Sequence, residues 1–530
     1  MTIETMPAPA ARPAPPSAPA AAIAGVVAAG AALAAGELAA AFIPGASSPL
    51  VAVGSAVIDL APPGSKELVV ALFGTNDKLA LTLVVAAAVL LAGALIGLLA
   101  RRSALLASLA IVALVGVGAL AALRDPTASL LNVLLAAALQ VAAGLLVLET
   151  LMDAARPRPE AATRPGAADE ARRGFLVKAG ALGLLAFVGH AIGRGVIDGR
   201  AAATAATAAA AVAIPATVDP APSIAADNAF DIDGITPLVI ANDAFYRIDT
   251  ALVTPSVDIK SWTLRVFGMV DREVTLTFDQ LVELPLIERY VTITCVSNEV
   301  GGDLIGNARW TGVRLADVLD MAGVQAGATQ VVPRSVDGWA AGFPTGWVTA
   351  PERPRDALIA VKMNGDPLPV AHGFPARLIV PGLYGYVSAT KWLKEIELTT
   401  WEAFDSYWVP RGWSKTGPVL TQSRIDVPRL NAGYRTGDTI QVAGVAWAMD
   451  RGVSGVDVRV DDGDWKPATL ATALGPQTWV QWRFAWGAVA GRHTFTVRAT
   501  DGGGVVQEER VTPPPPDGAR GYHSVSVQVD

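Results

Sequence analysis

Five long apolar runs before residue 200 constrain this sequence more than any other feature. Each run is long enough to cross the ~30 Å hydrocarbon core of a bilayer as a helix of about 20 residues. The runs lack a polar face and are separated by short charged loops, which argues against the buried helices of a soluble bundle. We therefore predict a multi-span α-helical membrane region over residues 1–200, with spans at residues 20–44, 79–100, 104–123, 129–152 and 175–193.

The segment between the first two runs, residues 45–78, does not fit this pattern. Two apolar pieces, residues 50–60 and 68–74, flank Pro62-Pro63-Gly64. Neither piece is long enough to cross a bilayer, so we expect a surface or re-entrant segment here.

The distribution of arginine gives the spans an orientation. Arg101 and Arg102 lie between the second and third spans. The loop before the fifth span carries five more: Arg156, Arg158, Arg164, Arg172 and Arg173. The other loops mix basic with acidic residues. If both arginine-rich loops are cytoplasmic, the N-terminus is cytoplasmic too, and everything after about residue 196 is extracytoplasmic.

The last two of these arginines also begin a segment typical of export signals. Arg172-Arg173-Gly174-Phe175-Leu176, followed by a moderately apolar stretch, resembles a twin-arginine signal. Its internal position is unusual, and a pair of positive charges flanking an ordinary span is the alternative. Twin-arginine export would suit a domain that folds before it crosses the membrane.

The composition changes after residue 200. The whole chain of 530 residues is 52% hydrophobic and only 17% charged, but the hydrophobic excess lies before that point. Residues 201–222 are rich in Ala, Thr and Pro and are expected to form a linker. The remainder has an ordinary globular composition and is long enough for two cores. The formal net charge of −7 gives no indication of a nucleic-acid partner.

Residues 223–410 mix strand and helix patterns, which predicts an α+β domain. The expected elements are strands at Ser261–Val266 and Tyr290–Cys295, helices at Phe278–Glu283 and Leu315–Met321, and a type I′ turn at Asn364-Gly365.

Residues 411–530 instead predict an all-β domain. Apolar residues alternate with polar ones in four segments: Val456–Val460, Val480–Trp486, Phe495–Ala499 and Val525–Val529. Short strands separated by turns such as Asp462-Gly463 indicate an immunoglobulin-like sandwich. The acidic segment at residues 461–464 lacks the ligand spacing of an EF-hand, so we predict no calcium site there.

The chain contains a single cysteine, Cys295. This count excludes a disulfide framework, a Cys-based zinc site, an iron–sulfur cluster and C-x-x-C-H haem attachment. Cys295 ends a predicted strand, and Ser297, Asn298, Gly301 and Gly302 follow it closely. Strand ends followed by small and polar residues often carry chemistry, so a merely buried cysteine is the weaker interpretation.

Two motifs resemble the sulfite oxidase family of molybdopterin-dependent oxidoreductases. They are CVSNEVGGDLIGNARWTG, which begins at Cys295, and HGFPARLIVPGLYGYVSATKW, which begins at His372. The resemblance covers about residues 235–530. It implies that the Cys295 thiolate ligates molybdenum beside the two sulfurs of a pterin dithiolene, as suits a soft ligand and a thiophilic metal. It also implies that residues 411–530 are a dimerisation domain, so a homodimer is expected.

The resemblance also assigns residues to the cofactor. His372, Arg377 and Lys391 match the positions that bind its phosphate, and basic side chains are the expected ligands of an anion. Further contacts are implied, with less direct matches, for Tyr246, Arg247, Ser335, Ser388, Ala389 and Thr390.

One segment departs from the family pattern. Sulfite oxidases place a tyrosine beside the substrate, whereas the counterpart in Tyr407–Trp413 is Trp413, which donates a hydrogen bond but does not ionise as a phenol does. Arg411 and Trp413 are predicted to line the substrate entrance. We therefore expect oxo transfer with a small substrate of the sulfite, sulfoxide or N-oxide type rather than sulfite in particular.

The predicted function is thus a membrane-anchored molybdenum oxidoreductase that faces the extracytoplasmic side. Its electron partner must be a separate membrane or periplasmic protein, because we find neither a haem nor an iron–sulfur motif; His190 alone in a predicted span cannot supply both haem ligands. Two alternatives remain open at this stage. One is a cysteine hydrolase or transpeptidase that uses Cys295 and His372. The other is a non-catalytic membrane scaffold.

Overall fold

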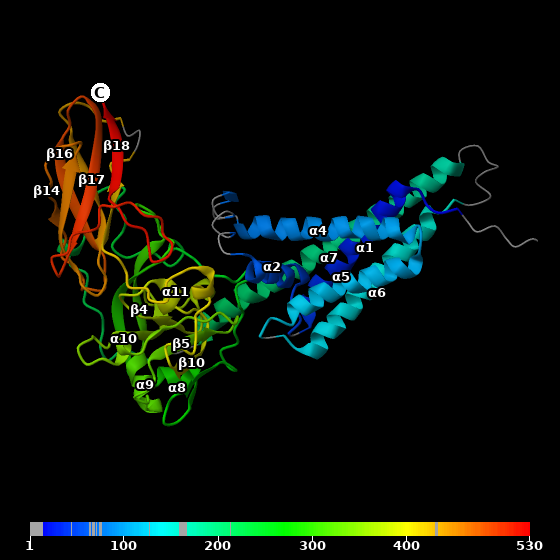
Figure 1. Cartoon of the computed structure of the whole chain (residues 1–530), viewed down its shortest axis with the longest axis horizontal. Helices are drawn as coiled ribbons and strands as arrows, with labels where there is room; N and C mark the ends of the chain where they lie inside the picture. The colour runs from blue at the N-terminus through cyan, green and yellow to red at the C-terminus, as the bar shows by residue number, and fades with distance from the viewer. Residues whose placement is uncertain are drawn as a thin grey trace, which may run out of the picture. The chain divides into compact units, whose positions relative to one another are not determined.

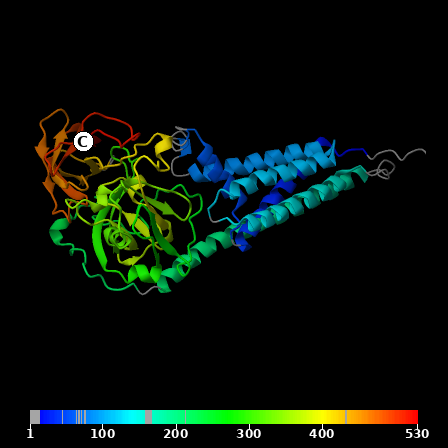
Figure 2. The same cartoon turned by 60° about the horizontal axis from the view of Figure 1, so that its bottom comes forward.

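The computed structural model describes residues 14–43, 45–62, 65, 69, 72–73, 77–126, 128–157, 167–211, 214–429 and 433–530. Its contacts divide the chain into two compact units, shown in two views in Figures 1 and 2. The helical unit comprises Met1–Ala202 with Ala251–Val253, and the β-rich unit comprises Ala203–Thr250 with Thr254–Asp530. Among the residues named above, Pro63, Gly64, Arg158 and Arg164 lie outside the described residues.

The helical unit contains the long helices that the apolar runs predict. They are α1 (Ala18–Phe42), α4 (Asp77–Ala100), α5 (Ala104–Ala122), α6 (Leu130–Ala155) and α7 (Ala167–Ala211). All five are long and apolar enough to cross a membrane. The structure differs at α7, which continues through residues 201–211 of the expected linker. Alanine has the highest helix propensity, which explains this extension.

The segment between α1 and α4 contains a shorter helix, α2 (Pro49–Leu60). The Ser48 hydroxyl caps its first turn by accepting the Val51 amide, and Pro49 occupies a position where no amide donor is needed. With 12 residues it is too short to span a bilayer, as its apolar length predicts. Most of the second apolar piece, residues 68–74, lies outside the described residues.

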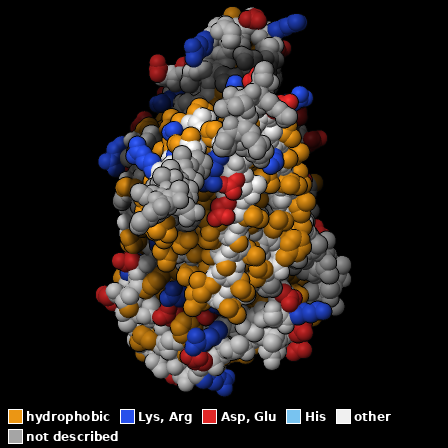
Figure 3. Space-filling view, turned by 90° about the vertical axis from the view of Figure 1, so that its right-hand side faces the viewer, with side chains coloured by type: hydrophobic (Ala, Val, Ile, Leu, Met, Phe, Trp, Pro, Cys, Tyr) orange, Lys and Arg blue, Asp and Glu red, His pale blue; other side chains and the backbone are white. Residues whose placement is uncertain are grey.

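Small residues line the contacts between the long helices, and large ones face outward. A Cβ on Gly25 of α1 would overlap the backbone of Gly93 and approach Gly97 of α4 to 2.6 Å. Leu83, Leu91 and Leu95 of α4 are more than half exposed. Hydrophobic side chains are widespread on the face seen in Figure 3. Close packing through glycine with leucine outside is typical of helices that meet in lipid.

Two sheets form the first part of the β-rich unit. In one, the strand order is β2-β1-β10-β5-β6, with β1 and β10 parallel. In the other, the order is β3-β4-β7-β8, and β9 also pairs with β7. The strands are β1 (Thr263–Gly268), β2 (Val274–Thr277), β3 (Leu286–Thr294), β4 (Ile305–Arg314), β5 (Gln330–Ser335), β6 (Phe343–Pro344), β7 (Leu358–Met363), β8 (Asp366–Pro367), β9 (Arg377–Ile379) and β10 (Leu393–Thr399).

Short helices connect these strands. They are α8 (Phe278–Val282), α9 (Leu315–Ala322), α10 (Gly346–Thr349) and α11 (Gly385–Ser388), with 3₁₀ turns η3 (Ala226–Asn228), η4 (Val370–His372) and η5 (Val409–Arg411). Local sequence signals explain where two of these helices begin or end. A capping box of Thr277 and Gln280 begins α8, and Gly323 ends α9 with a φ of +70°. Because the helices are so short, this part is β-rich rather than evenly mixed.

The last part of the β-rich unit consists of two four-stranded antiparallel sheets with one core between them. Their orders are β11-β12-β16-β15 and β14-β13-β17-β18. The strands are β11 (Gln422–Val427), β12 (Thr439–Trp447), β13 (Val453–Val460), β14 (Lys466–Pro467), β15 (Thr469–Leu470), β16 (Val480–Gly487), β17 (Gly491–Asp501) and β18 (His523–Val529). Trp482 and Phe495 lie in the shared core. We call these two sheets the sandwich.

Candidate functional site

Cys295 follows directly after β3 and is 8% exposed. Its amide donates to the Leu304 carbonyl at 2.9 Å, and its carbonyl accepts the Asn298 amide at 3.1 Å. These bonds use only the backbone, so they orient the residue without occupying the sulfur.

The motif that begins at His372 includes β9. Gly373 has a φ of +115°, and a Cβ there would approach Arg377 and Lys391 to 3.0–3.1 Å. Only glycine both adopts this backbone conformation and leaves that space free. The glycine therefore lets His372, Arg377 and Lys391, which all belong to this motif, lie close together.

Arg377 is the most unusual member of this cluster. It is 6% exposed, and its guanidinium donates to the carbonyls of His372 (3.1 Å) and Ala389 (3.5 Å). It also lies 4.9 Å from the ring centroid of Trp310. Its Nε is buried without a partner, and no carboxylate pairs with it among the described residues. Burial lowers the pKa of Arg377 to about 10, which leaves a positive charge in need of an anion.

His372 is held in one tautomer. Its Nε2 lies 2.8 Å from the Asn242 carbonyl oxygen, which can only accept, so Nε2 carries the proton. Burial, reinforced by the charge of Arg377, lowers the pKa of His372 to about 4. At neutral pH the ring is therefore uncharged, and its Nδ1 can accept a hydrogen bond but cannot donate one.

Lys391 is paired with an acid that the sequence did not single out, Asp249. Lys391 Nζ donates to Asp249 Oδ2 at 2.8 Å, and Arg247 Nε donates to the same oxygen at 2.9 Å. Burial lowers the pKa of Lys391 to about 8, although the Asp249 charge opposes this shift. The predicted residues Arg247 and Lys391, which are distant in sequence, thus meet on one carboxylate.

Ser335 brings a second acid close to this pair. The Asp337 amide donates to Ser335 Oγ at 3.4 Å, and Asp337 Oδ1 accepts the Trp339 amide at 3.1 Å. Burial raises the pKa of Asp337, and the charges of Asp249 and Lys391 act on it in opposite directions. Ser335 therefore belongs to the same neighbourhood as Lys391.

The three residues before Lys391 differ in what they offer. The Ser388 hydroxyl donates to the carbonyls of Leu383 and Tyr384, so it already has acceptors just before its own helix, α11. The Ala389 carbonyl accepts from Arg377. Thr390 is fully buried, and its hydroxyl has no partner. Only Thr390 combines burial with a free hydroxyl.

Two tyrosines are electrostatically coupled to Cys295. Burial raises the pKa of Tyr246, a Cys295 charge raises it further, and Arg377 opposes both. Tyr246 stacks on Phe245, whose ring is 5.7 Å from that of His372. Burial also raises the pKa of Tyr384 to about 12, with a smaller contribution from Cys295. Tyr246 is therefore within electrostatic reach of both the cysteine and Arg377, and Tyr384 is a neighbour of the cysteine that the sequence did not indicate.

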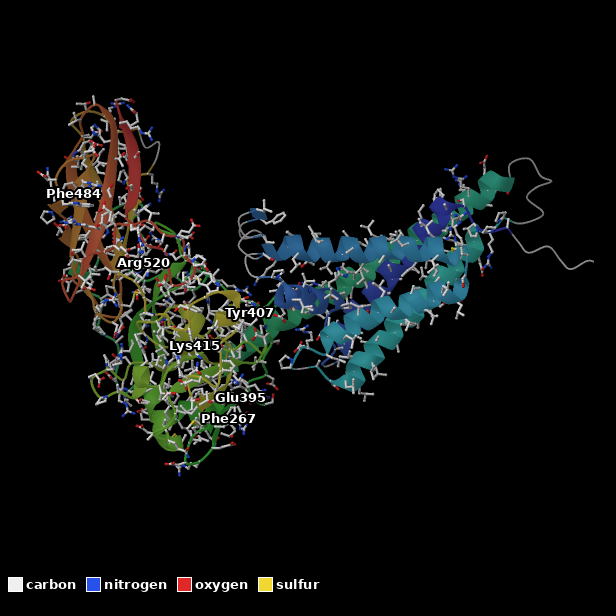
Figure 4. The ribbon with its side chains drawn as sticks, viewed as in Figure 1. Phe267, Glu395, Tyr407, Lys415, Phe484 and Arg520 are labelled. Carbon is white, nitrogen blue, oxygen red and sulfur yellow. The ribbon has the colours of Figure 1, made fainter. Side chains whose placement is uncertain are left out.

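Arg411 and Trp413 lie in an aromatic segment around η5. The Arg411 guanidinium covers the Tyr407 ring at 3.7 Å from its centroid and donates to the Tyr407 carbonyl at 2.6 Å. The buried Trp413 packs against Tyr386 and Trp408. Figure 4 labels Tyr407 and Lys415, which mark this segment. The structure thus shows a cluster of packed aromatic rings here, and the role at the substrate entrance stays a prediction.

Comparison with known proteins decides the family. A family model described as an oxidoreductase molybdopterin binding domain matches residues 251–408. Human mitochondrial sulfite oxidase is 30% identical over 296 residues, covering 48% of this chain and 52% of the human protein. An uncharacterised oxidoreductase of Bacillus subtilis (strain 168), YuiH, is 34% identical over 167 residues, covering 32% of this chain and 79% of YuiH. The chain belongs to the sulfite oxidase family of molybdopterin oxidoreductases.

The match to these family members is partial in length. The chain spans about half the length of the human sulfite oxidase that it resembles. A crystal structure of the sulfane dehydrogenase SoxCD from Paracoccus pantotrophus gives a TM-score of 0.49 at 20% identity, covering 56% of this chain and 82% of that one. Family membership lends no support to the hydrolase interpretation of Cys295 and His372.

The donor set fits the cofactor of the sulfite oxidase family. Arg247, Arg377 and Lys391 supply three basic groups, against the carboxyls of Asp249 and Asp337. The orphaned Arg377 Nε and Thr390 hydroxyl are the kind of buried donors that an anionic group would satisfy. A single thiol, Cys295, is present for a thiophilic metal. These residues are therefore suited to a phosphate-bearing cofactor that carries a metal.

The shifted pKa of His372 predicts acid sensitivity. Between pH 6.5 and 4 the unfolded chain binds a proton that the folded chain does not, so stability should fall as the pH falls through this window, by up to about 3 kcal/mol. His372→Gln keeps a donor for the Asn242 carbonyl but does not titrate, so its unfolding free energy should depend less on pH. Urea unfolding followed by tryptophan fluorescence at pH 7 and pH 4.5 measures this. If the unfolding free energy changed equally between the two pH values in the wild type and in His372→Gln, the assignment would be contradicted. His493→Gln is the matched control.

Proposed function

We propose that this chain is a membrane-anchored molybdenum oxidoreductase that transfers an oxygen atom to or from a small substrate, coupled to two electrons. One observation carries the proposal: the buried Tyr246 phenol is within electrostatic reach both of the only thiol of the chain and of Arg377, a buried cation with an unpartnered donor. A thiolate for a metal beside cations for an anion matches a molybdenum–pterin phosphate and few other ligands.

The proposed roles follow from the geometry of each side chain. Cys295 ligates molybdenum. Arg377 and Lys391 bind the phosphate as charged donors, and the Thr390 hydroxyl adds a neutral one. Tyr246, Arg247, Ser335, Ser388 and Ala389 complete the cofactor surroundings. When bound, the cofactor supplies the two-electron oxygen-atom exchange itself, and the protein binds, orients and excludes water.

The proposed role of His372 is narrower than the sequence motif implies. Its Nε2 proton is already donated to the Asn242 carbonyl, and the neutral ring has only Nδ1 free. An uncharged acceptor suits a ring N–H of the pterin better than a phosphate oxygen. The phosphate is then left to Arg377 and Lys391, which are the charged members of the cluster.

The substrate class is proposed from the aromatic segment. Arg411 and Trp413 would line the entrance, where a guanidinium attracts a polar oxo group and an indole donates a hydrogen bond without ionising. Sulfite, sulfoxides and N-oxides all fit this description. The electrons would pass to or from a separate membrane or periplasmic protein.

The proposed location has the N-terminus in the cytoplasm and the β-rich unit outside. The five apolar helices and the positions of Arg101, Arg102, Arg172 and Arg173 support it. If Arg172-Arg173 is a twin-arginine signal, replacing the pair with Lys-Lys should leave the β-rich unit inaccessible to protease added to spheroplasts. If the protease reached the β-rich unit of the Lys-Lys variant as it does in the wild type, Arg172-Arg173 would act only as positive charges that flank a membrane span.

Domain boundaries and assembly complete the proposal. We place the catalytic domain at residues 223–410 and an immunoglobulin-like dimerisation domain at residues 411–530, which the antiparallel sheets of the sandwich support. Sedimentation of the purified chain in detergent tests the homodimer, since a purely monomeric profile would contradict it.

Metal and pterin analysis of the purified full-length chain is the decisive experiment. We expect about one molybdenum and one pterin per chain, together with turnover of at least one member of a panel of sulfite, sulfoxides and N-oxides with an artificial electron carrier. A chain that is folded but contains neither molybdenum nor pterin would contradict the proposed function.

A further inference from the structure

The loop that begins at Cys295 is closed by its own hydrogen bonds. Besides the backbone bonds of Cys295, the Asn298 side chain accepts the Leu304 amide at 2.9 Å. A Cβ on Gly302 would approach the same Asn298 oxygen to 2.6 Å, so the loop is wrapped tightly around that side chain. The direction of the Cys295 side chain therefore depends on how the loop of residues 295–304 is held as a whole.

Two side chains of the sandwich contact this loop. His523, the first residue of β18, lies against Gly301, where a Cβ would overlap its imidazole ring. Gly301 also has a φ of +78°, a conformation that favours glycine. Arg424 of β11 donates from Nη1 to the Gly302 carbonyl at 2.7 Å. Two adjacent glycines of the loop thus each meet a side chain from a distant part of the sequence.

A hydrogen bond from the backbone of the sandwich fixes the ring of His523. Its Nδ1 lies 3.0 Å from the Ile425 amide, which can only donate, so Nδ1 carries no proton. Burial lowers the pKa of His523, and the neighbouring Arg424 charge adds to this effect. Ile425 lies beside an irregularity in the pairing of β11 with β12. The ring is therefore neutral, has one orientation, and presents the edge containing Nε2 and Cδ2 to Gly301.

Arg424 is fixed equally well. Its Nε donates to Asp426 Oδ1 at 2.7 Å, and its Nη2 donates to Thr236 Oγ1 at 2.7 Å. Asp426 in turn accepts the Thr236 amide at 2.9 Å. The guanidinium is buried, and each of its three nitrogens has an acceptor. A planar group held at every nitrogen has little freedom to follow a moving loop, so the Gly302 carbonyl has a rigid anchor.

We propose that His523 and Arg424 are positioning residues, which hold the loop of residues 295–304 so that the Cys295 thiol points as metal ligation requires. The inference rests on the proposed role of Cys295 as the metal ligand. It gives the sandwich a task within its own chain, separate from any contact between two chains. Gly301, which has a positive φ, packs against the fixed His523 ring, and the Gly302 carbonyl accepts from the fixed Arg424 guanidinium. Together these two contacts leave the loop no neighbouring position to occupy.

The single cysteine makes alkylation a direct measure of loop order. The rate at which iodoacetamide modifies Cys295 is measured on the full-length chain in detergent, made in cells that cannot synthesise the pterin. The absorption band of the thiolate–metal bond is measured on the molybdenum-loaded chain. His523→Ala should raise the alkylation rate about tenfold, because the loop opens more often, and should shift the band. His493→Ala, at the other histidine of the sandwich, should change neither.

Two further variants separate the contact from a general loss of folding. Gly301→Ala alone should also raise the alkylation rate, but it should add less in the His523→Ala background, because the ring that the new Cβ overlaps is gone. His523→Gln, whose amide oxygen can still accept the Ile425 amide, should restore part of the protection. Unchanged alkylation and absorption in His523→Ala would overturn the proposal, as would a Gly301→Ala effect that is equal in both backgrounds. A wild-type chain without molybdenum would overturn the proposed function instead, while the alkylation rates would still decide the positioning role.

Discussion

Cys295→Ser should lose oxo-transfer activity and bound molybdenum by more than about a hundredfold, since loss of even an outer partner of a metal ligand costs about 10–100-fold. Serine offers a hard oxygen that stays protonated at neutral pH, where the metal needs a soft thiolate. The fold should survive, because the hydrogen bonds of Cys295 with Leu304 and Asn298 run through its backbone. Molybdenum content, activity and the urea unfolding midpoint of the purified chain measure the three effects.

Ser297→Ala is the matched control for this variant. Ser297 is an exposed residue of the same loop and is given no ligand role, so its replacement should leave molybdenum content and activity close to those of the wild type. A Cys295→Ser chain that keeps its molybdenum and its activity would remove Cys295 from the metal site. Equal losses in both variants would assign the effect to the loop rather than to the thiol.

Local patterns in the sequence were sufficient for much of the fold. The five apolar runs predicted the long helices, since hydrophobic length alone decides whether a helix crosses a bilayer. The alternating segments around Val458 and Val497 predicted β13 and β17, which each bury one face. In contrast, four of the six residues of β11 are polar although the strand is buried along nearly its whole length, so its sequence shows neither apolar alternation nor an apolar run and gave no signal.

The site was predicted only in part, for a similar reason. The two motifs indicated Cys295 and the cluster of His372, Arg377 and Lys391, because each motif lies within one short stretch of chain. Asp249, Asp337 and Tyr384 were missed as site residues although each lies close in sequence to a predicted one, because only tertiary structure shows which partner each of them meets. Asp249 lies 142 residues before the lysine that it pairs with, and neither residue carries a local sign of the other. The contact of His523 with Gly301 has the same origin.

Arg377→Met should separate cofactor binding from protein stability. Loss of the guanidinium removes a main phosphate ligand, and we expect pterin and molybdenum content to fall at least about tenfold, because charge-assisted hydrogen bonds are worth roughly 1.5–3 kcal/mol each. The cofactor-free chain should be no less stable than the wild type, and up to about 2 kcal/mol more stable. In that chain Arg377 is a buried charge without a carboxylate, and its pKa of about 10 reflects an unfavourable environment for the charge.

Arg424→Met provides the matched contrast, since Arg424 is equally buried but is paired with Asp426. Its loss leaves a buried carboxylate without its cation, which should cost about 3 kcal/mol. Urea unfolding of the cofactor-free wild type, Arg377→Met and Arg424→Met chains measures the two opposite changes in unfolding free energy. Metal and pterin analysis compares how much cofactor the three chains bind. A large destabilisation by Arg377→Met, equal to that of Arg424→Met, would mean that Arg377 serves the fold. A destabilisation by Arg424→Met alone, with cofactor loss in Arg377→Met, would mean that the β-rich unit maintains an uncompensated cation for the anion it binds.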